Sequence, residues 1–214
     1  MSRLLRITEI FYSIQGESST SGWPTIFVRL TGCPLRCQYC DTSYAFHGGR
    51  KSSFEEILAE LSQYQCNRIC VTGGEPLAQP NCYPLMSFLA DHGYQISLET
   101  SGARDIQAVD PRVMVVMDLK TPDSKEEARN LYENLKYLKA SDQIKFVICS
   151  ELDYNWAKNI ITQYKIPAGV EILFSPSFGQ IKANILADWI LRDQLPVRFQ
   201  IQLHKILWDD GPGR

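Results

Sequence analysis

Three cysteines lie close together in the segment Cys33-Pro-Leu-Arg-Cys37-Gln-Tyr-Cys40. Three thiolates on one short loop can hold a metal, because thiolate is a ligand both of zinc and of cluster iron. Four protein ligands would close a structural zinc site or cap every iron of a [4Fe–4S] cluster, whereas three leave one iron open to an outside ligand. His47 is the candidate fourth ligand for zinc. Zinc and an iron–sulfur cluster therefore both stay open on this motif alone.

The other four of the seven cysteines, Cys66, Cys70, Cys82 and Cys149, are scattered through apolar stretches. Free cysteine is among the residue types most often buried, so we expect these four to belong to the core. An odd number of cysteines without a secretory signal argues against a disulfide framework. The first ten residues lack the apolar region of a signal peptide, and no apolar run approaches the ~18 residues of a membrane span. We therefore predict a cytoplasmic protein that does not enter the membrane.

The charge balance is close to neutral, with 22 Lys and Arg against 24 Asp and Glu, a formal charge of −2. This balance disfavours a strongly basic nucleic-acid binder, although it leaves a local basic patch open, so we expect no nucleic-acid partner. A chain of 214 residues can bury a sizeable core without disulfides or structural metals. No internal repeat, low-complexity tract or Gly/Ser linker divides the sequence. We predict a single domain over residues 1–214, with an N-terminal strand extension.

Short β-branched runs alternate with amphipathic stretches along the chain. Strands are predicted at residues 5–10, 25–30, 68–72, 95–99, 113–119, 144–148, 170–174 and 197–202, and helices at 53–65, 83–91, 125–138, 154–164 and 181–192. Ser53 and Glu56 form a capping-box pattern at the start of the first helix. Alternating strands and helices indicate βαβ units and a parallel sheet. About six units predict an α/β fold, a shortened partial (β/α) barrel, because a closed eight-unit barrel usually needs ~250 residues.

Ligands of parallel α/β folds bind at the carboxyl ends of the strands, which directs attention to the loops that follow them. The C-x3-C-x2-C loop follows one predicted strand, and its aromatic Tyr39 precedes the last cysteine. This loop resembles that of the radical SAM superfamily, whose members use S-adenosylmethionine (SAM). Val71-Thr-Gly-Gly-Glu-Pro76 follows the next strand and resembles the segment of that superfamily that receives the methionine amino group. The resemblance implies a [4Fe–4S] cluster on Cys33, Cys37 and Cys40, with SAM on the open iron.

Further segments resemble one family of that superfamily, the 7-carboxy-7-deazaguanine synthases. They are Glu9 to Glu17, Gly22 to Thr42, Leu98 to Gly102 and Gln202 to Lys205, and the resemblance spans essentially the whole chain. It implies a lyase that converts 6-carboxy-5,6,7,8-tetrahydropterin to 7-carboxy-7-deazaguanine with loss of ammonia, in queuosine and 7-deazapurine biosynthesis. It also implies that SAM is used catalytically, that Mg²⁺ assists, that the protein is a homodimer, and that an electron donor such as flavodoxin is required.

The same resemblance assigns roles to individual positions. The implied pterin contacts are Ile14, Gln15, Gly16, Arg29 and Thr72. Thr42 is the implied Mg²⁺ ligand. The implied SAM contacts are Tyr39, Cys40, Asp41, Gly74, Glu99, Asp118, Lys120, Ser175 and Pro176. Two roles agree with elementary chemistry, because a guanidinium binds a planar carboxylate in bidentate fashion and Mg²⁺ prefers oxygen ligands.

Plain structural roles stay open for several of these residues. Arg29 can be a solvent-facing strand residue, Thr42 a turn or cap, and Lys120 a solvated strand end, while Glu99 can be structural. His204 lies near the C-terminus, where a lone histidine more often packs or caps than catalyses.

The sequence also departs from the family pattern in three places. Family members often carry Gln-Pro where this chain has Ser175-Pro176, and glycine where it has Ser18. The tail Ile206 to Arg214 has no clear counterpart. Two rival functions remain: a radical SAM activase that makes a glycyl radical on a partner protein, and a zinc-binding module without catalysis.

Overall fold

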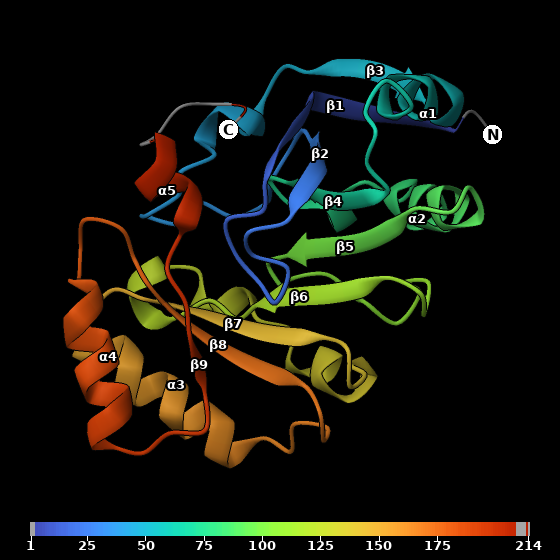
Figure 1. Cartoon of the computed structure of the whole chain (residues 1–214). Helices are drawn as coiled ribbons and strands as arrows, with labels where there is room; N and C mark the ends of the chain where they lie inside the picture. The colour runs from blue at the N-terminus through green and yellow to red at the C-terminus, as the bar shows by residue number, and fades with distance from the viewer. Residues whose placement is uncertain (1–2, 209–212, 214) are drawn as a thin grey trace.

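The computed structural model describes residues 3–208 and 213, and its centre is one curved, nine-stranded sheet (Figure 1). The strands are β1 (Leu4–Ile14), β2 (Pro24–Leu30), β3 (Arg50–Ser53), β4 (Arg68–Gly73), β5 (Gln95–Thr100), β6 (Met114–Asp118), β7 (Gln143–Ile148), β8 (Glu171–Pro176) and β9 (Arg198–Phe199). Their order in the sheet is β3-β1-β2-β4-β5-β6-β7-β8-β9. The first and last strands do not pair with each other, so the sheet is a barrel that stays open.

The strands from β2 to β9 are parallel, whereas β1 is antiparallel to both β2 and β3. The predicted α/β partial barrel is therefore confirmed, with β1 and β3 as an extension at one edge. Because parallel strands present their carboxyl ends at the same edge, the loops that follow β2, β4, β5, β6, β7 and β8 meet at one end of the sheet. This arrangement brings together segments that are far apart in the sequence.

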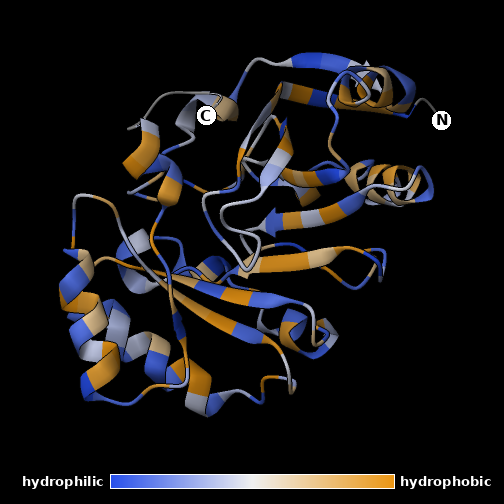
Figure 2. Cartoon of the chain, in the orientation of Figure 1, coloured by the Kyte–Doolittle hydropathy of each residue, from blue (hydrophilic) through white to orange (hydrophobic). Residues whose placement is uncertain are grey.

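The helices are α1 (Phe54–Leu61), α2 (Cys82–Asp91), α3 (Glu151–Gln163), α4 (Ala183–Arg192) and α5 (Leu203–Trp208). The capping box predicted at the first helix is confirmed, because the Ser53 hydroxyl accepts from the Glu56 amide at 3.1 Å and the Glu56 carboxylate accepts from the Ser53 amide at 2.8 Å. Figure 2 shows hydrophobic residues along the strands and on one face of the outer helices. None of the helices in the described ranges is both long and apolar enough to cross a membrane.

The predicted helix at residues 125–138 is wrong. The chain forms two short 3-10 turns there, Glu127–Arg129 and Tyr132–Tyr137, and a third, Pro122–Ser124, directly before them. Lys125 has a left-handed backbone with φ of 66°, which interrupts a helix. The Asn134 side chain donates to the carbonyls of Gly102 and Arg104 and accepts from the Ile106 amide. These bonds to the loop after β5 replace the regular helical pattern.

Three other elements differ from expectation. The strand predicted at 197–202 is only two residues long, because the chain leaves the sheet after Phe199 and the Leu203 amide bonds to the carbonyl of Gly16 at 3.0 Å. The helix α5 follows and was not predicted. The strand β3 was also missed, because its sequence Arg-Lys-Ser-Ser has no apolar pattern and pairs only with β1 at the edge of the sheet.

All seven cysteines are free. Cys70, Cys82 and Cys149 are buried, as predicted for core cysteines. Cys66 is only partly buried, and its Sγ lies 3.4 Å from the carbonyl of Pro24, so the expectation of a core position is met in part. The three remaining cysteines lie at the carboxyl end of the sheet.

Candidate active site

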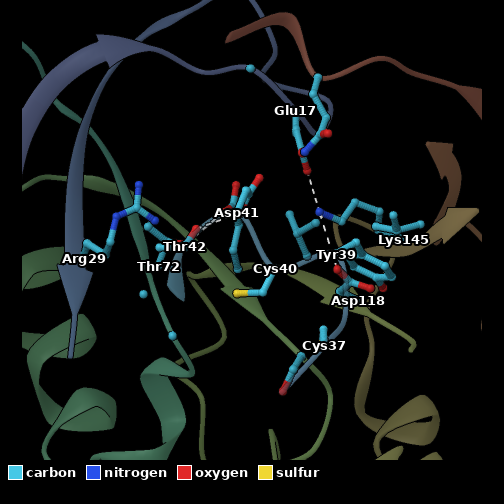
Figure 3. Close-up of a pocket in the computed structure, with 18 of the residues that line it drawn as sticks. Glu17, Arg29, Cys37, Tyr39, Cys40, Asp41, Thr42, Thr72, Asp118 and Lys145 are labelled. Carbon is cyan, nitrogen blue, oxygen red and sulfur yellow. Dashed lines mark hydrogen bonds and ion pairs between the residues drawn. The ribbon is translucent and has the colours of Figure 1, made fainter. Parts of the chain in front are cut away.

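A pocket lies inside the curve of the sheet, at the carboxyl ends of β2, β4, β5, β6 and β7 (Figure 3). The loop between β1 and β2 and the segment that leads into α5 also line it. The predicted site residues that line the pocket are Ile14, Gln15, Gly16, Arg29, Cys33, Cys37, Tyr39, Cys40, Asp41, Thr42, Thr72, Gly74, Glu99, Asp118 and Lys120. Residues from six separate segments of the sequence therefore share one cavity.

The three clustered cysteines occupy the loop directly after β2. Burial raises the pKa of the Cys33 thiol, and burial raises the pKa of the Cys37 thiol to about 11. Thiol ligands bind a metal as thiolates, so metal binding at these cysteines would release protons. His47, the candidate fourth zinc ligand, is not among the residues that line this pocket.

Two glycines at the end of β4 allow close approach to the cysteine loop. A Cβ on Gly74 would lie 2.4 Å from the carbonyl oxygen of Gly32 and 2.7 Å from the Cβ of Cys33. The neighbouring Glu75 is fully buried, and its carboxylate accepts hydrogen bonds from the Leu77 amide and from Thr100 and Ser101. Glu75 thus ties β4 to the end of β5, and the glycines leave backbone groups beside the cysteines for a ligand.

Arg29 projects into the pocket from β2, and its orientation is fixed by its neighbours. Its Nε donates to the Glu9 carboxylate at 2.7 Å, and its guanidinium lies over the rings of Phe11 and Tyr44. Only 15% of its side chain is exposed, so it is not a solvent-facing strand residue. Glu9 occupies the Nε edge, while the Nη groups form no hydrogen bond within residues 3–208 and 213. The arginine is therefore held ready for a second carboxylate.

Glu99 at the end of β5 organises two predicted pterin contacts. Its Oε1 accepts from the side-chain amide of Gln15 at 3.2 Å, and its Oε2 accepts from the Thr72 hydroxyl at 3.0 Å. These bonds join the loop after β1 to β4 and β5. Glu99 therefore has a structural role and also lines the pocket.

Four charged side chains alternate in sign along one wall of the pocket. Lys145 from β7 contacts Glu17 at 2.5 Å and Asp118 at 3.6 Å (Figure 3). Asp118 in turn contacts Lys120 at 2.9 Å. Burial alone would raise the pKa of Asp118, but the two lysines hold this pKa below its usual value. Burial would likewise raise the pKa of Glu17, but the charge and hydrogen bond of Lys145 lower this pKa below its usual value. The wall therefore presents fixed charges in a mostly dehydrated setting.

Two buried polar atoms in this region lack partners. The Tyr39 hydroxyl and Asp118 Oδ1 form no hydrogen bond with any group in the described part of the chain. Lys120 lies 5.7 Å from the centre of the Tyr39 ring, so both atoms belong to the same corner of the pocket. Buried polar groups are nearly always satisfied, which indicates that a polar ligand completes this corner.

Asp41 and Thr42 place side-chain oxygen atoms at the end of the cysteine loop. The Thr42 hydroxyl donates to Asp41 at 2.8 Å, and Lys205 lies 3.5 Å from the other carboxylate oxygen of Asp41. Burial opposes ionisation of Asp41, yet its bond to Thr42 and the charge of Lys205 lower its pKa. A hydroxyl beside an ionised carboxylate is the donor set that Mg²⁺ prefers.

Comparison with known proteins identifies the family. The model of the radical SAM superfamily matches residues 27–148. A 7-carboxy-7-deazaguanine synthase from Chlorobaculum tepidum is 45% identical over 208 residues, which cover 96% of this chain and 94% of that protein. A second from Koribacter versatilis is 42% identical, covering 95% of this chain and 97% of that protein.

The chain belongs to the 7-carboxy-7-deazaguanine synthase family. It is a radical SAM enzyme, and its superfamily implies a [4Fe–4S] cluster and SAM. A crystal structure of QueE from Escherichia coli shares the fold, with a TM-score of 0.80 at 22% identity, over 94% of this chain and 95% of that one. The two relatives from Chlorobaculum tepidum and Koribacter versatilis both carry the synthase name, which supports the synthase reading over the activase and zinc alternatives.

The pocket fits the cofactors of this family. Three free thiols face it, the glycine cradle adjoins them, and the unpartnered Tyr39 and Asp118 atoms lie beside them. Across the described ranges, no three His, Cys, Asp or Glu side chains converge closely enough to hold a metal ion. A structural zinc site takes four protein ligands, whereas three thiolates suit a four-iron cluster with one open iron, and His47 is not among the residues that line the pocket.

Ser175 and Pro176 lie at the end of β8, directly before lining residues, but do not line the pocket themselves. Both are buried within β8, which extends two residues beyond the predicted strand end, and neither is among the lining residues. Ser177 and Phe178 line the pocket in their place. The SAM contact expected at Ser175 and Pro176 therefore stays a prediction.

Several lining residues were missed or left open by the sequence analysis. They are Glu17, Lys145, Gln202 and Lys205, together with His204, which was left undecided. Lys145 had a signal, because it is the one charged residue inside the apolar strand β7. A Cβ on Gly16 would lie 2.1 Å from the His204 ring, so glycine there is required by close packing.

Ser18 also acquires an explanation. It has a left-handed backbone with φ of 67°, a conformation that glycine adopts at lower cost. Its amide donates to the side chain of Gln200 at 2.9 Å, and its hydroxyl contacts Thr20 at 2.9 Å. These bonds hold the loop over the pocket in spite of the missing glycine. Of the unaligned tail, residues 209–212 and 214 lie outside the described residues.

Proposed function

We propose that this chain converts 6-carboxy-5,6,7,8-tetrahydropterin to 7-carboxy-7-deazaguanine with loss of ammonia, as a carbon–nitrogen lyase of queuosine and 7-deazapurine biosynthesis. The observation that carries the proposal is one pocket in which a held guanidinium, Arg29, lies with the three-cysteine loop. Relatives that carry the synthase name cover nearly the whole chain, which supports the same reaction. The bound cluster and SAM supply the radical that starts this chemistry, with SAM regenerated in each turnover.

Within this proposal, the chain binds and orients the pterin. The Nη groups of Arg29 take the carboxylate at C6 in bidentate fashion. Ile14, Gln15 and Gly16 contact the ring partly through backbone groups, and Thr72 contacts it from β4. Glu99 holds Gln15 and Thr72 in place, which limits the motion of the substrate in the pocket. Such positioning supplies much of the rate enhancement when the reactive species belongs to a cofactor.

The opposite wall is the proposed SAM site. Lys120 pairs with the methionine carboxylate, and the Gly74 backbone and Asp41 contact the remainder of the methionine portion. Tyr39 packs against the adenine, and the free Asp118 Oδ1 accepts from a SAM donor group. The loop at Glu17 and Ser18 closes over both ligands, since it is bonded to Lys145 and Gln200. Closure excludes water and oxygen from the radical stage.

We also propose that Thr42, with Asp41 beside it, holds Mg²⁺ against oxygen atoms of the pterin. A protein site with few ligands suits this ion, which usually keeps waters and substrate oxygens in its coordination shell. Thr42→Val removes the hydroxyl and keeps the shape, so stimulation of turnover by Mg²⁺ should fall about tenfold. The measurement is turnover against Mg²⁺ concentration. Undiminished stimulation in the variant would eliminate Thr42 as a ligand.

Three further features of this proposal concern partners and location. We expect an electron donor such as flavodoxin, a homodimer, and a cytoplasmic location. We also expect residues 1–214 to fold as a single domain.

The decisive experiment is anaerobic reconstitution with iron and sulfide, followed by turnover of the carboxylated pterin with SAM and a reductant. The proposal expects deazaguanine product, ammonia, and no net consumption of SAM. Stoichiometric SAM cleavage without product would refute the pterin reaction. Radical transfer to an added polypeptide instead would favour the activase.

A further inference from the structure

The segment after β6 lies against the cysteine loop and holds the backbone on both sides of Cys37. The Ser124 carbonyl accepts from the amide of Gln38 at 3.1 Å, and the Glu126 carboxylate accepts from the amide of Arg36 at 2.5 Å. Both bonds join positions about ninety residues apart. This is the part of the chain in which a regular helix was expected and 3-10 turns were found.

The segment itself is anchored before it reaches the loop. Ser124 is fully buried, and its hydroxyl donates to the Thr121 carbonyl at 2.5 Å and accepts from the Glu126 amide at 3.1 Å. The Asp123 amide donates to Asp153 of α3 at 2.9 Å. The left-handed turn at Lys125 reverses the chain between these anchors. Glu126 is therefore presented to the loop by a fixed support.

Arg36 is part of the cysteine loop, and its side chain hydrogen-bonds to the backbone of the same loop. Its Nη1 donates to the carbonyls of Cys33 and Leu35 at 2.7 and 2.6 Å, and its guanidinium lies 4.2 Å from the centre of the Phe46 ring. The side chain is exposed, yet its amide and its head group are both bonded. Arg36 thus connects the backbone at Cys33 to the point where Glu126 holds the chain.

A loop with no regular secondary structure depends on such partners for its shape, because its backbone groups must be bonded one by one. Three thiolates repel one another when they converge, and ordering a free loop costs conformational entropy. Residues that hold the ligands in place before the metal binds reduce both the repulsion between the thiolates and the entropy lost on ordering the loop. Residues that hydrogen-bond to metal ligands generally have this effect.

We propose that Glu126 is a positioning residue for the cluster. It fixes the Arg36 amide and, together with the Arg36 side chain, holds Cys33 and Cys37 at the separation that the cluster needs. This inference rests on the cluster that the superfamily implies and does not depend on which substrate is bound.

The test compares Glu126→Ala with Glu126→Gln, which keeps an oxygen acceptor at the same distance. Glu133→Ala is the matched control, because Glu133 lies in the same segment, is 74% exposed and contacts only Lys136 at 3.6 Å in the described residues. After reconstitution, the alanine variant of Glu126 should lose iron to a chelator about tenfold faster than the wild type. The glutamine variant and the control should lose iron at the wild-type rate.

A second readout uses the protein without iron. Hydrogen exchange of the Arg36 amide should be fast in Glu126→Ala and slow in the wild type, Glu126→Gln and Glu133→Ala. Equal iron loss and equal amide exchange in Glu126→Ala and wild type would overturn the proposal, and so would equal acceleration of iron loss in Glu133→Ala. A wild type that takes up no iron would overturn it together with the cluster. Retained iron without pterin turnover would count against the proposed reaction alone.

Discussion

Cys37→Ala is expected to abolish turnover, with a loss of more than about a thousandfold, because the chemistry belongs to a cofactor that two cysteines do not retain. Cys37 lies between the two held amides of the loop, and Cys33, Cys37 and Cys40 are the three cysteines of the described residues that line the pocket. The measurement is iron and sulfide per chain after anaerobic reconstitution, beside turnover. Wild type should bind about four irons per chain and the variant far fewer.

Cys66→Ser is the matched control for this change. Cys66 is partly buried at the opposite end of β4, where its Sγ accepts from the Arg68 amide at 3.4 Å. A serine hydroxyl can accept from the same amide, so iron content and turnover should stay at wild-type values. Full iron content in Cys37→Ala, or equal loss in both variants, would remove Cys37 from the cluster.

Arg29→Met is expected to lower kcat/KM for the carboxylated pterin by about a hundredfold or more. Removing one partner of a buried, hydrogen-bonded charge pair typically costs about 2–5 kcal/mol. Arg29→Lys should recover only part of the loss, because an ammonium keeps the charge without the planar fork. The cluster should assemble normally in both variants, since Arg29 contacts Glu9 and two rings rather than the cysteine loop.

The substrate itself provides the sharper comparison for Arg29. A tetrahydropterin without the carboxyl group should bind weakly to wild type and equally weakly to Arg29→Met. Arg198→Met is the matched control, because Arg198 is 42% exposed and contacts Glu171 on the outer edge of the sheet. An unchanged kcat/KM in Arg29→Met, or an equal loss with the analogue, would eliminate the carboxylate contact.

The sequence predicted strands and helices correctly where the pattern depends on residues that are close together in the chain. The strands that carry the site residues were found because each is a short apolar run followed by a polar or glycine-rich loop, as in β4 and its Gly73-Gly74. The helix at 125–138 failed for the opposite reason. Its leucines have helical spacing, but Asn134 bonds to the loop after β5, and no periodic pattern contains that contact.

The sequence by itself determined the chemistry of the site. Cys33, Cys37 and Cys40 lie on one loop, and Gly73 and Gly74 lie at the end of one strand. Residues this close in the sequence are also close together in the folded protein. The rule that parallel strands present their loops at one edge then brought Arg29, Glu99 and Lys120 to the same pocket.

The tertiary structure alone decided what holds those groups in place. Glu17 meets Lys145, Glu9 fixes Arg29, and Glu126 bonds to the amide beside Cys37. These pairs join positions from 20 to 128 residues apart. The packing of strands and loops determines which partner each residue contacts. The residues next to a charged side chain in the sequence do not predict the distant group that it contacts.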